Sequence, residues 1–269
     1  MRSERFFKDP NLPFAELRCS RSSSDSFKPH MHRTLGIGAV DDGEVIYTLI
    51  GETASLVPGT LVVFNPEALH ACNPAEGSVR SYYMLHLDTD WCLKVQQTLW
   101  NVGGFIAAEK TRIENAALYE AYCRTMVLLM DGQVHLEEKE QALYELICDI
   151  FTVVCRPGES RETTGGDVAR LKKLLSTDLQ RDWPLDSLAA SLDANPYTLI
   201  RSFKAVTGIT PHAYRMNCRI EKARELLREG REIADTALEC GFFDQSHFHR
   251  YFKAMTTVTP QAYRINFLQ

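Results

Sequence analysis

Short apolar runs separated by turn-forming residues dominate the first part of the chain, from about Phe14 to Asp88. Leu61–Phe64 is one such run, and the pairs Asp42-Gly43 and Pro58-Gly59 interrupt the sequence on its N-terminal side. Strands that are this short and closely spaced are typical of a small β-sandwich or barrel. We therefore predict a β domain over residues 1–110.

The apolar period changes from about Arg112 onward and then favours helices. A first helix is expected after Arg112 and a second over Leu136–Val154, where Leu143 and Ile150 follow Leu136 at steps of seven residues. A stripe at this spacing packs against its own domain or pairs two copies of a chain, and the sequence leaves both open. We predict a helical pair over 111–155 that serves dimerisation.

A polar segment rich in Gly and Pro follows the helical pair. Residues 156–167 have the composition of a flexible linker. Beyond this segment the apolar positions keep a helical period to the end of the sequence. The sequence therefore predicts a separate all-helical domain over 168–269.

The predicted helical domain contains an internal repeat. Ile200–Lys204 matches His249–Lys253, Thr210–Arg215 matches Thr259–Arg264, and the offset is 49 residues in both cases. Two motifs rarely share one offset by chance. We infer that a supersecondary unit is duplicated.

Each copy of the repeat is predicted to be two helices joined by a tight turn. In the first copy Asp193-Ala194 turns the chain, Asn195 caps the next helix and Pro196 suits its first position. In the second copy Gly241 supplies a left-handed turn and Asp244 the cap. The expected buried residues are Leu185, Leu188, Ala189, Leu192, Leu199, Phe203 and Val206 in the first copy, and Ile233, Ala237, Cys240, Phe248 and Phe252 in the second.

The two helices of each pair are expected to approach closely. Ala189 and Ala237 occupy equivalent places, where a helix-turn-helix needs a small side chain. A helix from Pro211 to about Leu227 joins the two pairs. The second helix of each pair then suits a DNA major groove, with the two grooves about one turn, roughly 34 Å, apart.

Polar and basic side chains remain once the buried positions of the two second helices are removed. We predict that these residues bind DNA: Tyr197, Thr198, Ile200, Arg201 and Lys204 in the first copy, and Gln245, Ser246, His249, Arg250 and Lys253 in the second. Arg makes bidentate contacts to guanine and Gln to adenine, and apolar side chains meet thymine methyl groups. Lys204 and Lys253 lie nearer the helix ends, where contact with phosphate is expected.

The distribution of charge supports this function although the total does not. The formal net charge is −5, which by itself argues against a nucleic-acid partner. Residues 168–269 hold 15 Lys and Arg against 11 Asp and Glu, whereas residues 1–167 hold 15 against 24. Because attraction to phosphate decays over roughly 10 Å at moderate salt, a basic domain works on an acidic carrier.

The remaining composition points to the cytoplasm. The sequence has no run of 18 apolar residues and no secretory signal, so we expect no membrane partner. None of the eight cysteines forms a CxxC pair, which indicates reduced thiols.

The motifs of the helical domain resemble those of the AraC/XylS family of bacterial transcription regulators. The residues that carry the resemblance are Asn195–Lys204, Thr207–Pro211, Ile233–Phe242, Gln245–Phe248, Phe252-Lys253 and Pro260–Arg264. The resemblance implies promoter binding, most often activation with RNA polymerase as partner, and association with the bacterial nucleoid. It places base contacts on Tyr197, Ile200 and Arg201, and on Gln245, Ser246, His249 and Arg250. Ile200 departs from the family, in which a polar residue is more usual.

The β domain is similar, more loosely, to the cupin-type sensor barrel of that family. Pro29–His32, Pro58–Pro66 and His70 carry this likeness, and we predict that His30, His32 and His70 line an effector pocket. Cupin enzymes hold a metal with two His, a Glu a few residues later and a further His. Here Leu35–Ile37 stand where the Glu is expected, so we predict neither a metal nor a cofactor.

The sequence as a whole predicts an α+β multidomain protein, with a cupin-like barrel and helical pair followed by an all-α domain with two helix-turn-helix motifs. We expect a DNA-binding transcriptional regulator without enzymatic activity, responsive to a small-molecule effector and dimeric through 112–155. Two alternatives remain: a cupin-type metalloenzyme fused to a DNA-binding module, and a ligand-free interaction protein that uses the helices of 112–155. The effector and the direction of regulation are not encoded in any pattern that we find.

Overall fold

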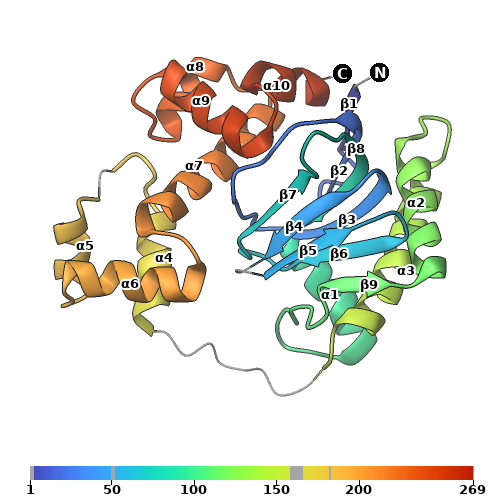
Figure 1. The fold of residues 1–269 in the computed structure, drawn as a ribbon, viewed down its shortest axis with the longest axis horizontal. Coiled ribbons are helices and arrows are strands. Elements are labelled where there is room, and N and C mark those ends of the chain that lie inside the picture. The colour runs from blue at the N-terminus through green and yellow to red at the C-terminus, as the bar shows by residue number, and fades with distance from the viewer. Residues whose placement is uncertain (1–2, 50–51, 158–165, 182, 269) are drawn as a thin grey trace. The chain divides into compact units, whose positions relative to one another are not determined.

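The computed structural model describes residues 3–49, 52–157, 166–181 and 183–268, without the side chains of Asp167, Leu185, Tyr197 and Leu268. The chain divides into two compact units, one with most of the described residues up to 157 and one with those from 166 onward (Figure 1). Most of the predicted linker, residues 158–165, lies outside the described residues.

Two sheets form the first unit, and the neighbouring strands of the larger one are antiparallel. The larger sheet has the strand order β1-β2-β8-β3-β6-β9, and the smaller has the order β5-β4-β7. Their bounds are β1 Ser3–Phe7, β2 Ala15–Ser23, β3 Leu35–Asp42, β4 Val45–Leu49, β5 Glu52–Leu56, β6 Thr60–Phe64, β7 His70–Pro74, β8 Arg80–Leu87 and β9 Arg112–Glu114. Consecutive strands are often not neighbours, which is the arrangement of a sandwich or barrel rather than of a meander.

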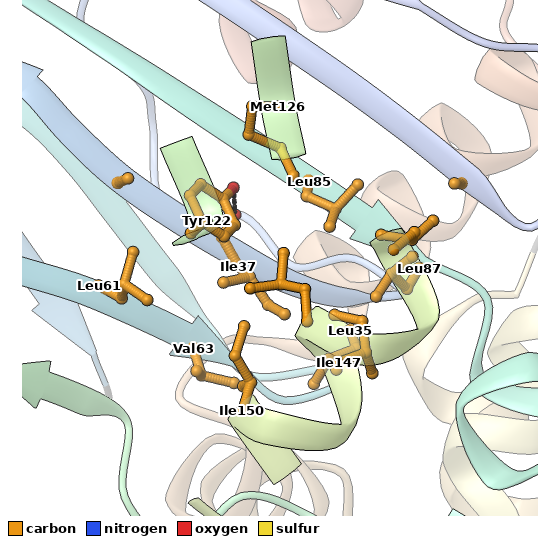
Figure 2. Packing of buried hydrophobic residues seen from close by; sticks show 14 of the residues in the cluster. Leu35, Ile37, Leu61, Val63, Leu85, Leu87, Tyr122, Met126, Ile147 and Ile150 are labelled. Carbon is orange, nitrogen blue, oxygen red and sulfur yellow. Dashed lines mark hydrogen bonds between the residues drawn. The ribbon is translucent and has the colours of Figure 1, made fainter. Parts of the chain in front are cut away.

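The larger sheet packs its apolar face against helices α2 (Ala116–Met130) and α3 (Leu136–Val154). Ile37 on β3 lies opposite Val63 on β6 and Leu85 on β8, so these side chains share one face. Figure 2 shows them directed toward the helices, where Tyr122 and neighbouring apolar side chains meet them. The hydroxyl of Tyr122 also donates a 2.6 Å hydrogen bond to the carbonyl of Ile37. This bond satisfies a polar group that the core would otherwise leave unpaired.

The heptad stripe of α3 belongs to this core. Leu143 and Ile150 are fully buried, together with Ile147, in the same cluster as the sheet residues. Figure 2 shows Ile147 and Ile150 among the side chains of the sheet. The stripe therefore packs within its own domain, and it is not a surface through which two copies of the chain can pair. Val127 on α2 and Val153 on α3 are instead exposed.

Three elements of the first unit differ from the sequence-based expectation. Strand β1 and helix α1 (Thr89–Trp100) were not predicted, although Asp88 caps α1 through the backbone N–H groups of Asp90 and Trp91. The stretch after Arg112 begins as strand β9, paired with β6, and the helix starts only at Ala116 after the cap Asn115.

The second unit is entirely helical over its described residues. Its helices are α4 (Gly166–Ser176), α5 (Leu185–Ser191), α6 (Pro196–Thr207), α7 (Pro211–Arg228), α8 (Ile233–Glu239), α9 (Gln245–Thr256) and α10 (Pro260–Leu268). Helix α7 packs against α4 and α6 on the side of the first repeat and against α8, α9 and α10 on the side of the second. It is therefore the axis of the unit, as the sequence predicts for a helix that joins two duplicated pairs.

Candidate nucleic-acid interface

The 49-residue repeat is reproduced in the hydrogen bonds that follow the second helix of each pair. The hydroxyl of Thr207 lies 2.7 Å from the carbonyl oxygen four residues before it and 3.0 Å from the one two residues after it. The hydroxyl of Thr256, 49 residues later, has the same two distances. Thr210 and Thr259 then cap the following helices in the same way, through the backbone N–H three residues on.

The same correspondence holds for a pair of arginines. Arg215 donates through Nη2 to the carbonyl of Arg181, just ahead of α5. Arg264 donates through Nη2 to the carbonyl of Gly230, just ahead of α8, at 3.0 Å. The two donors are 49 residues apart, and so are the two acceptors. Each arginine therefore holds the backbone just before the first helix of its own pair.

The turns between the paired helices follow a different offset. The backbone N–H of Ala194 donates to the carbonyl of Ala189, and that of Phe242 donates to the carbonyl of Ala237, each at 2.9 Å and 48 residues apart. Both alanines are buried, which confirms the predicted small side chain at the close approach of the helices. In both turns the residue directly before the donating N–H has a positive φ, which is 51° for Asp193 and 76° for Gly241.

The caps of the second helices return to the offset of 49. The Asn195 side chain accepts from the N–H of Thr198 at 3.3 Å, and the Asp244 side chain accepts from that of His247 at 2.6 Å. An offset that grows from 48 to 49 between turn and cap means that the second turn is one residue longer than the first. The additional residue is Phe243.

Helix α6 presents polar side chains to solvent, as predicted. Thr198, Arg201 and Lys204 are exposed, whereas the side chain of Tyr197 lies outside the described part of the chain. Ile200 is half-buried and lines a cavity of about 280 Å³ with Leu188 and others. The side chain of Ile200 is therefore shared between this cavity and solvent, and less of it is exposed than of Arg201 beside it.

One buried position predicted for α6 is wrong. Val206 is 60% exposed, although Leu199 and Phe203 on the same helix are buried as predicted. The buried face of α6 ends with Phe203, which packs edge-on against Tyr214 at 5.5 Å between ring centroids. Val206 lies beyond this contact, in the last turn of the helix.

Helix α9 presents a fuller polar surface. Its exposed residues include every one that we predicted for this helix: Gln245, Ser246, His249, Arg250 and Lys253. Phe248 and Phe252 form the buried face, and Phe252 packs against Tyr263 as Phe203 does against Tyr214. Within the described part of the chain, neither Arg201 nor Arg250 takes part in an ion pair. Both guanidinium groups can therefore serve a base or a phosphate.

Part of the positive charge of the second unit is internal. Arg215, Arg219 and Arg224 of α7 are buried. Arg219 donates through Nε to the carbonyl of Leu179 at 3.0 Å, and Arg224 pairs with Glu221 at 2.9 Å. A count of charged residues along the sequence does not distinguish these arginines from exposed ones, so it overestimates the charge that faces DNA.

The predicted effector histidines lie near one another. One ring nitrogen from each of His30, His32 and His70 lies within 4.8 Å of the others. The Nδ1 of His70 lies 2.8 Å from the carbonyl oxygen of Ala68, so Nδ1 carries a proton and donates it to that oxygen. His86, which we had not selected, packs edge-on against His32 with ring centroids 4.5 Å apart.

The group formed by these histidines contains no carboxylate among the described residues. Phe64 stacks on His70 with ring centroids 4.0 Å apart, which gives this side of the group an aromatic wall. Neutral imidazoles beside an aromatic ring suit hydrogen bonds to a polar organic molecule as well as a transition metal.

In the described residues, no helix has the length and apolar character that crossing a membrane requires.

Comparison with protein families gives one profile match in each of the two units of the fold. The profile of a helix-turn-helix domain matches residues 188–266. The profile of an AraC-like ligand binding domain matches residues 16–147. Together the two profiles include α6 and α9, the second helices of the two pairs, and all the described strands except β1.

Curated relatives match over nearly the whole chain. An uncharacterized HTH-type transcriptional regulator of Bacillus subtilis (strain 168), YbfI, is 26% identical over 245 residues, which are 89% of this chain and 87% of the relative. The HTH-type transcriptional activator RhaS of Citrobacter koseri is 26% identical over 261 residues, which are 92% of this chain and 90% of the relative.

The fold matches the solved structures of ToxT. ToxT from Vibrio cholerae O395 superposes with a TM-score of 0.64 at 13% sequence identity, over 94% of this chain and 97% of that chain. Unsaturated fatty acid bound ToxT gives 0.63 at 16% identity, over 98% and 97%. At these identities the likeness concerns the fold alone. It confirms the predicted order of a sheet-rich domain followed by a helical helix-turn-helix domain.

Proposed function

Since the chain belongs to the AraC family of DNA-binding transcriptional regulators, we propose that it binds promoter DNA through both helix-turn-helix units and activates transcription when a small molecule occupies its barrel. The observation that carries this proposal is the repeated hydrogen-bond framework around Thr207 and Thr256. That framework holds exposed Arg201 and Arg250 at equivalent positions of the two second helices. Equivalent placement of two basic side chains is what a tandem reader of DNA requires.

The two second helices have different tasks under this proposal. Helix α9 supplies most of the base contacts, through Gln245, Ser246, His249 and Arg250, because its outer face is polar and exposed. Helix α6 supplies Arg201 and Thr198, with Tyr197 and Ile200 as apolar contacts. Lys204 and Lys253 bind phosphate near the helix ends.

The domain limits follow from the same assignment. Residues 1–110 form the effector-binding barrel, 111–155 the helical pair, 156–167 the linker and 168–269 the DNA-binding domain. A small-molecule effector binds beside His30, His32 and His70, and its binding changes the affinity for DNA or for the dimer partner. Such coupling requires that the effector bind two states of the protein with different affinities.

The partners beyond DNA are a second copy of the chain and RNA polymerase. We place the homodimer contact on the outward faces of the helices in 112–155, which include exposed Val127 and Val153, since the heptad stripe is buried. The protein acts in the cytoplasm, on the nucleoid when bound to DNA. None of the eight cysteines forms a disulfide in the described part of the chain, which is consistent with a reducing compartment.

A metal-dependent cupin enzyme is the second candidate function, and the proximity of the three histidines favours it. Its relatives and the missing carboxylate favour the regulator instead. Metal analysis of the purified chain separates the two. Stoichiometric iron, manganese or nickel that His32→Ala and His70→Ala remove supports the enzyme, and its absence supports the regulator.

Selection from random duplex DNA tests the proposed function directly. The full chain should enrich one sequence with two unequal half-sites about one helical turn apart. The enriched duplex should then compete far better than a scrambled one in a mobility-shift assay. Enrichment of no defined sequence would overturn the proposal.

A further inference from the structure

The two turns of the DNA-binding domain differ by one residue, and the additional residue is an exposed aromatic one. Asp193, Ala194 and Asn195 connect α5 to α6, with Leu192 before them, whereas Gly241, Phe242, Phe243 and Asp244 connect α8 to α9. The bonds of Ala194 and Phe242 align the start of the turns, and the caps Asn195 and Asp244 align their ends. Phe243 has no counterpart in the first copy.

The backbone on both sides of Phe243 is fixed. Phe242 is 3% exposed, and its ring packs against those of Phe248 and His247, with centroids 5.1 Å and 5.6 Å away. Asp244 on the other side is held by its capping bond to the N–H of His247. The backbone of Phe243 is therefore constrained by the residues before and after it.

The ring of Phe243 itself is 90% exposed. A single exposed apolar residue is common on protein surfaces and carries no functional meaning by itself. The position of this ring is what distinguishes it. It immediately precedes the N-terminal turn of α9, and in a helix-turn-helix this end of the second helix faces the base edges.

The neighbours of Phe243 favour DNA as its partner. Gln245, Ser246, His249 and Arg250 are exposed on α9, and they offer hydrogen-bond donors and positive charge. Such a surface suits bases and phosphates, whereas an apolar protein partner would leave these groups unpaired. A thymine methyl group in the major groove is the apolar feature that a phenyl ring contacts.

We propose that Phe243 is a specificity-determining residue that packs against the C5-methyl group of a thymine at the edge of the sequence bound by α9. This inference rests on the proposed function, since it requires that α9 enter the major groove. It adds an apolar contact at one base pair of the second half-site, which the first half-site lacks because its turn is one residue shorter.

Deoxyuridine substitution tests the proposal because it removes only the C5-methyl group of a thymine. In the enriched duplex, each thymine is replaced singly and the affinity of the wild-type chain is measured. One replacement in the second half-site should weaken binding about fourfold, which is the value of one buried methyl group. The same replacement should leave the affinity of Phe243→Ser unchanged, and Phe243→Leu should restore part of the sensitivity.

Thermal unfolding of Phe243→Ser serves as the folding control, and it should match that of the wild type because the ring is exposed. Equal losses for wild type and Phe243→Ser at every deoxyuridine position would overturn the proposal while specific binding stands. Retained DNA specificity with lost activation would place the ring against a protein and would also overturn it. Absence of any specific binding by the wild type would instead overturn the proposed function.

Discussion

Gly241 lies against the backbone carbonyl of Leu179, so that a β-carbon on residue 241 would overlap the carbonyl oxygen. The same oxygen accepts hydrogen bonds from Arg215 Nη2 and Arg219 Nε, each at 3.0 Å. Leu179 follows α4, ahead of the first helix-turn-helix, whereas Gly241 forms the turn of the second. One carbonyl group therefore joins the two halves of the DNA-binding domain through α7.

Replacement of Gly241 by alanine should destabilise the helical unit strongly. The left-handed backbone, with a φ of 76°, disfavours any β-carbon by about 1 kcal/mol. Overlap with a backbone oxygen adds to this cost because Leu179 cannot move without disturbing both arginine bonds. We expect Gly241→Ala to lower the free energy of unfolding of this unit by about 3 kcal/mol or more, measured by denaturant titration.

Gly77→Ala is the matched control for this change. Gly77 has a φ of 73°, but a β-carbon there meets nothing within 4 Å. It should cost only about 1 kcal/mol, the price of the left-handed backbone. Equal losses in the two variants would show that the contact with Leu179 is not rigid.

Loss of the two matched arginines should abolish sequence specificity. Each bidentate contact to a base contributes about 1–3 kcal/mol of discrimination, so Arg201→Ala with Arg250→Ala should bring binding of the enriched duplex close to that of random DNA. Lys253→Ala should instead weaken binding to all sequences alike and reduce the slope of log affinity against log salt by about one. Fluorescence anisotropy with both duplexes over a range of salt checks this. A double variant that discriminates like the wild type would contradict the assignment of α6 and α9.

In the helical pair of the first unit, stability and dimerisation should depend on different residues. Leu143→Ala removes a fully buried side chain, so it should cost about 2–5 kcal/mol of stability without changing the mass of the native particle. Val127→Glu with Val153→Glu should leave stability nearly unchanged and weaken the proposed dimer, because both valines are exposed. Sedimentation equilibrium measures the association. The surface is excluded as the dimer contact if the charged variant associates like the wild type.

Thiol labelling should report on the second helix-turn-helix. Burial, together with the nearby carboxylate of Glu239, raises the pKa of the Cys240 thiol to about 12. The reactive thiolate is therefore scarce at pH 8 and becomes abundant only as the pH approaches that pKa. Half-buried Cys148 should react before buried Cys240, which should react only when the unit opens. Mass spectrometry after timed alkylation checks the order, and Gly241→Ala should accelerate the labelling of Cys240 and of buried Cys218 in the same unit, but not that of Cys148.

The local signals in the sequence were sufficient for the helices of the second unit. The caps Asn195 and Asp244 and the glycine of the second turn behave as their residue types predict. The exposure of Val206 was not predictable, because the apolar spacing of α6 continues beyond Phe203, the last buried residue of that face. The length difference between the two turns was present in the sequence, and comparison of Ala189 with Ala237 would have revealed it.

The barrel was less predictable because its register depends on contacts between distant strands. Ile37 lies opposite both Val63 and Leu85, and no local pattern specifies this pairing. The first six residues of β3 are all buried, so the strand lacks the alternation that indicates which face is covered. The heptad spacing of α3 was correct as a helix signal, but spacing alone does not say whether a sheet or a second chain receives the stripe.

The axis formed by α7 has a consequence for the promoter. Its 18 residues span about 27 Å as a continuous helix, and the carbonyl of Leu179 fixes the second turn to the first half of the unit. The distance between the two second helices, α6 and α9, is therefore expected to stay constant. About five base pairs, half a helical turn, inserted between the half-sites would turn them to opposite sides of the duplex, and the contacts of α7 and Leu179 oppose a matching rotation of the two halves. Promoters bound by this regulator should therefore vary in sequence but keep one helical phase.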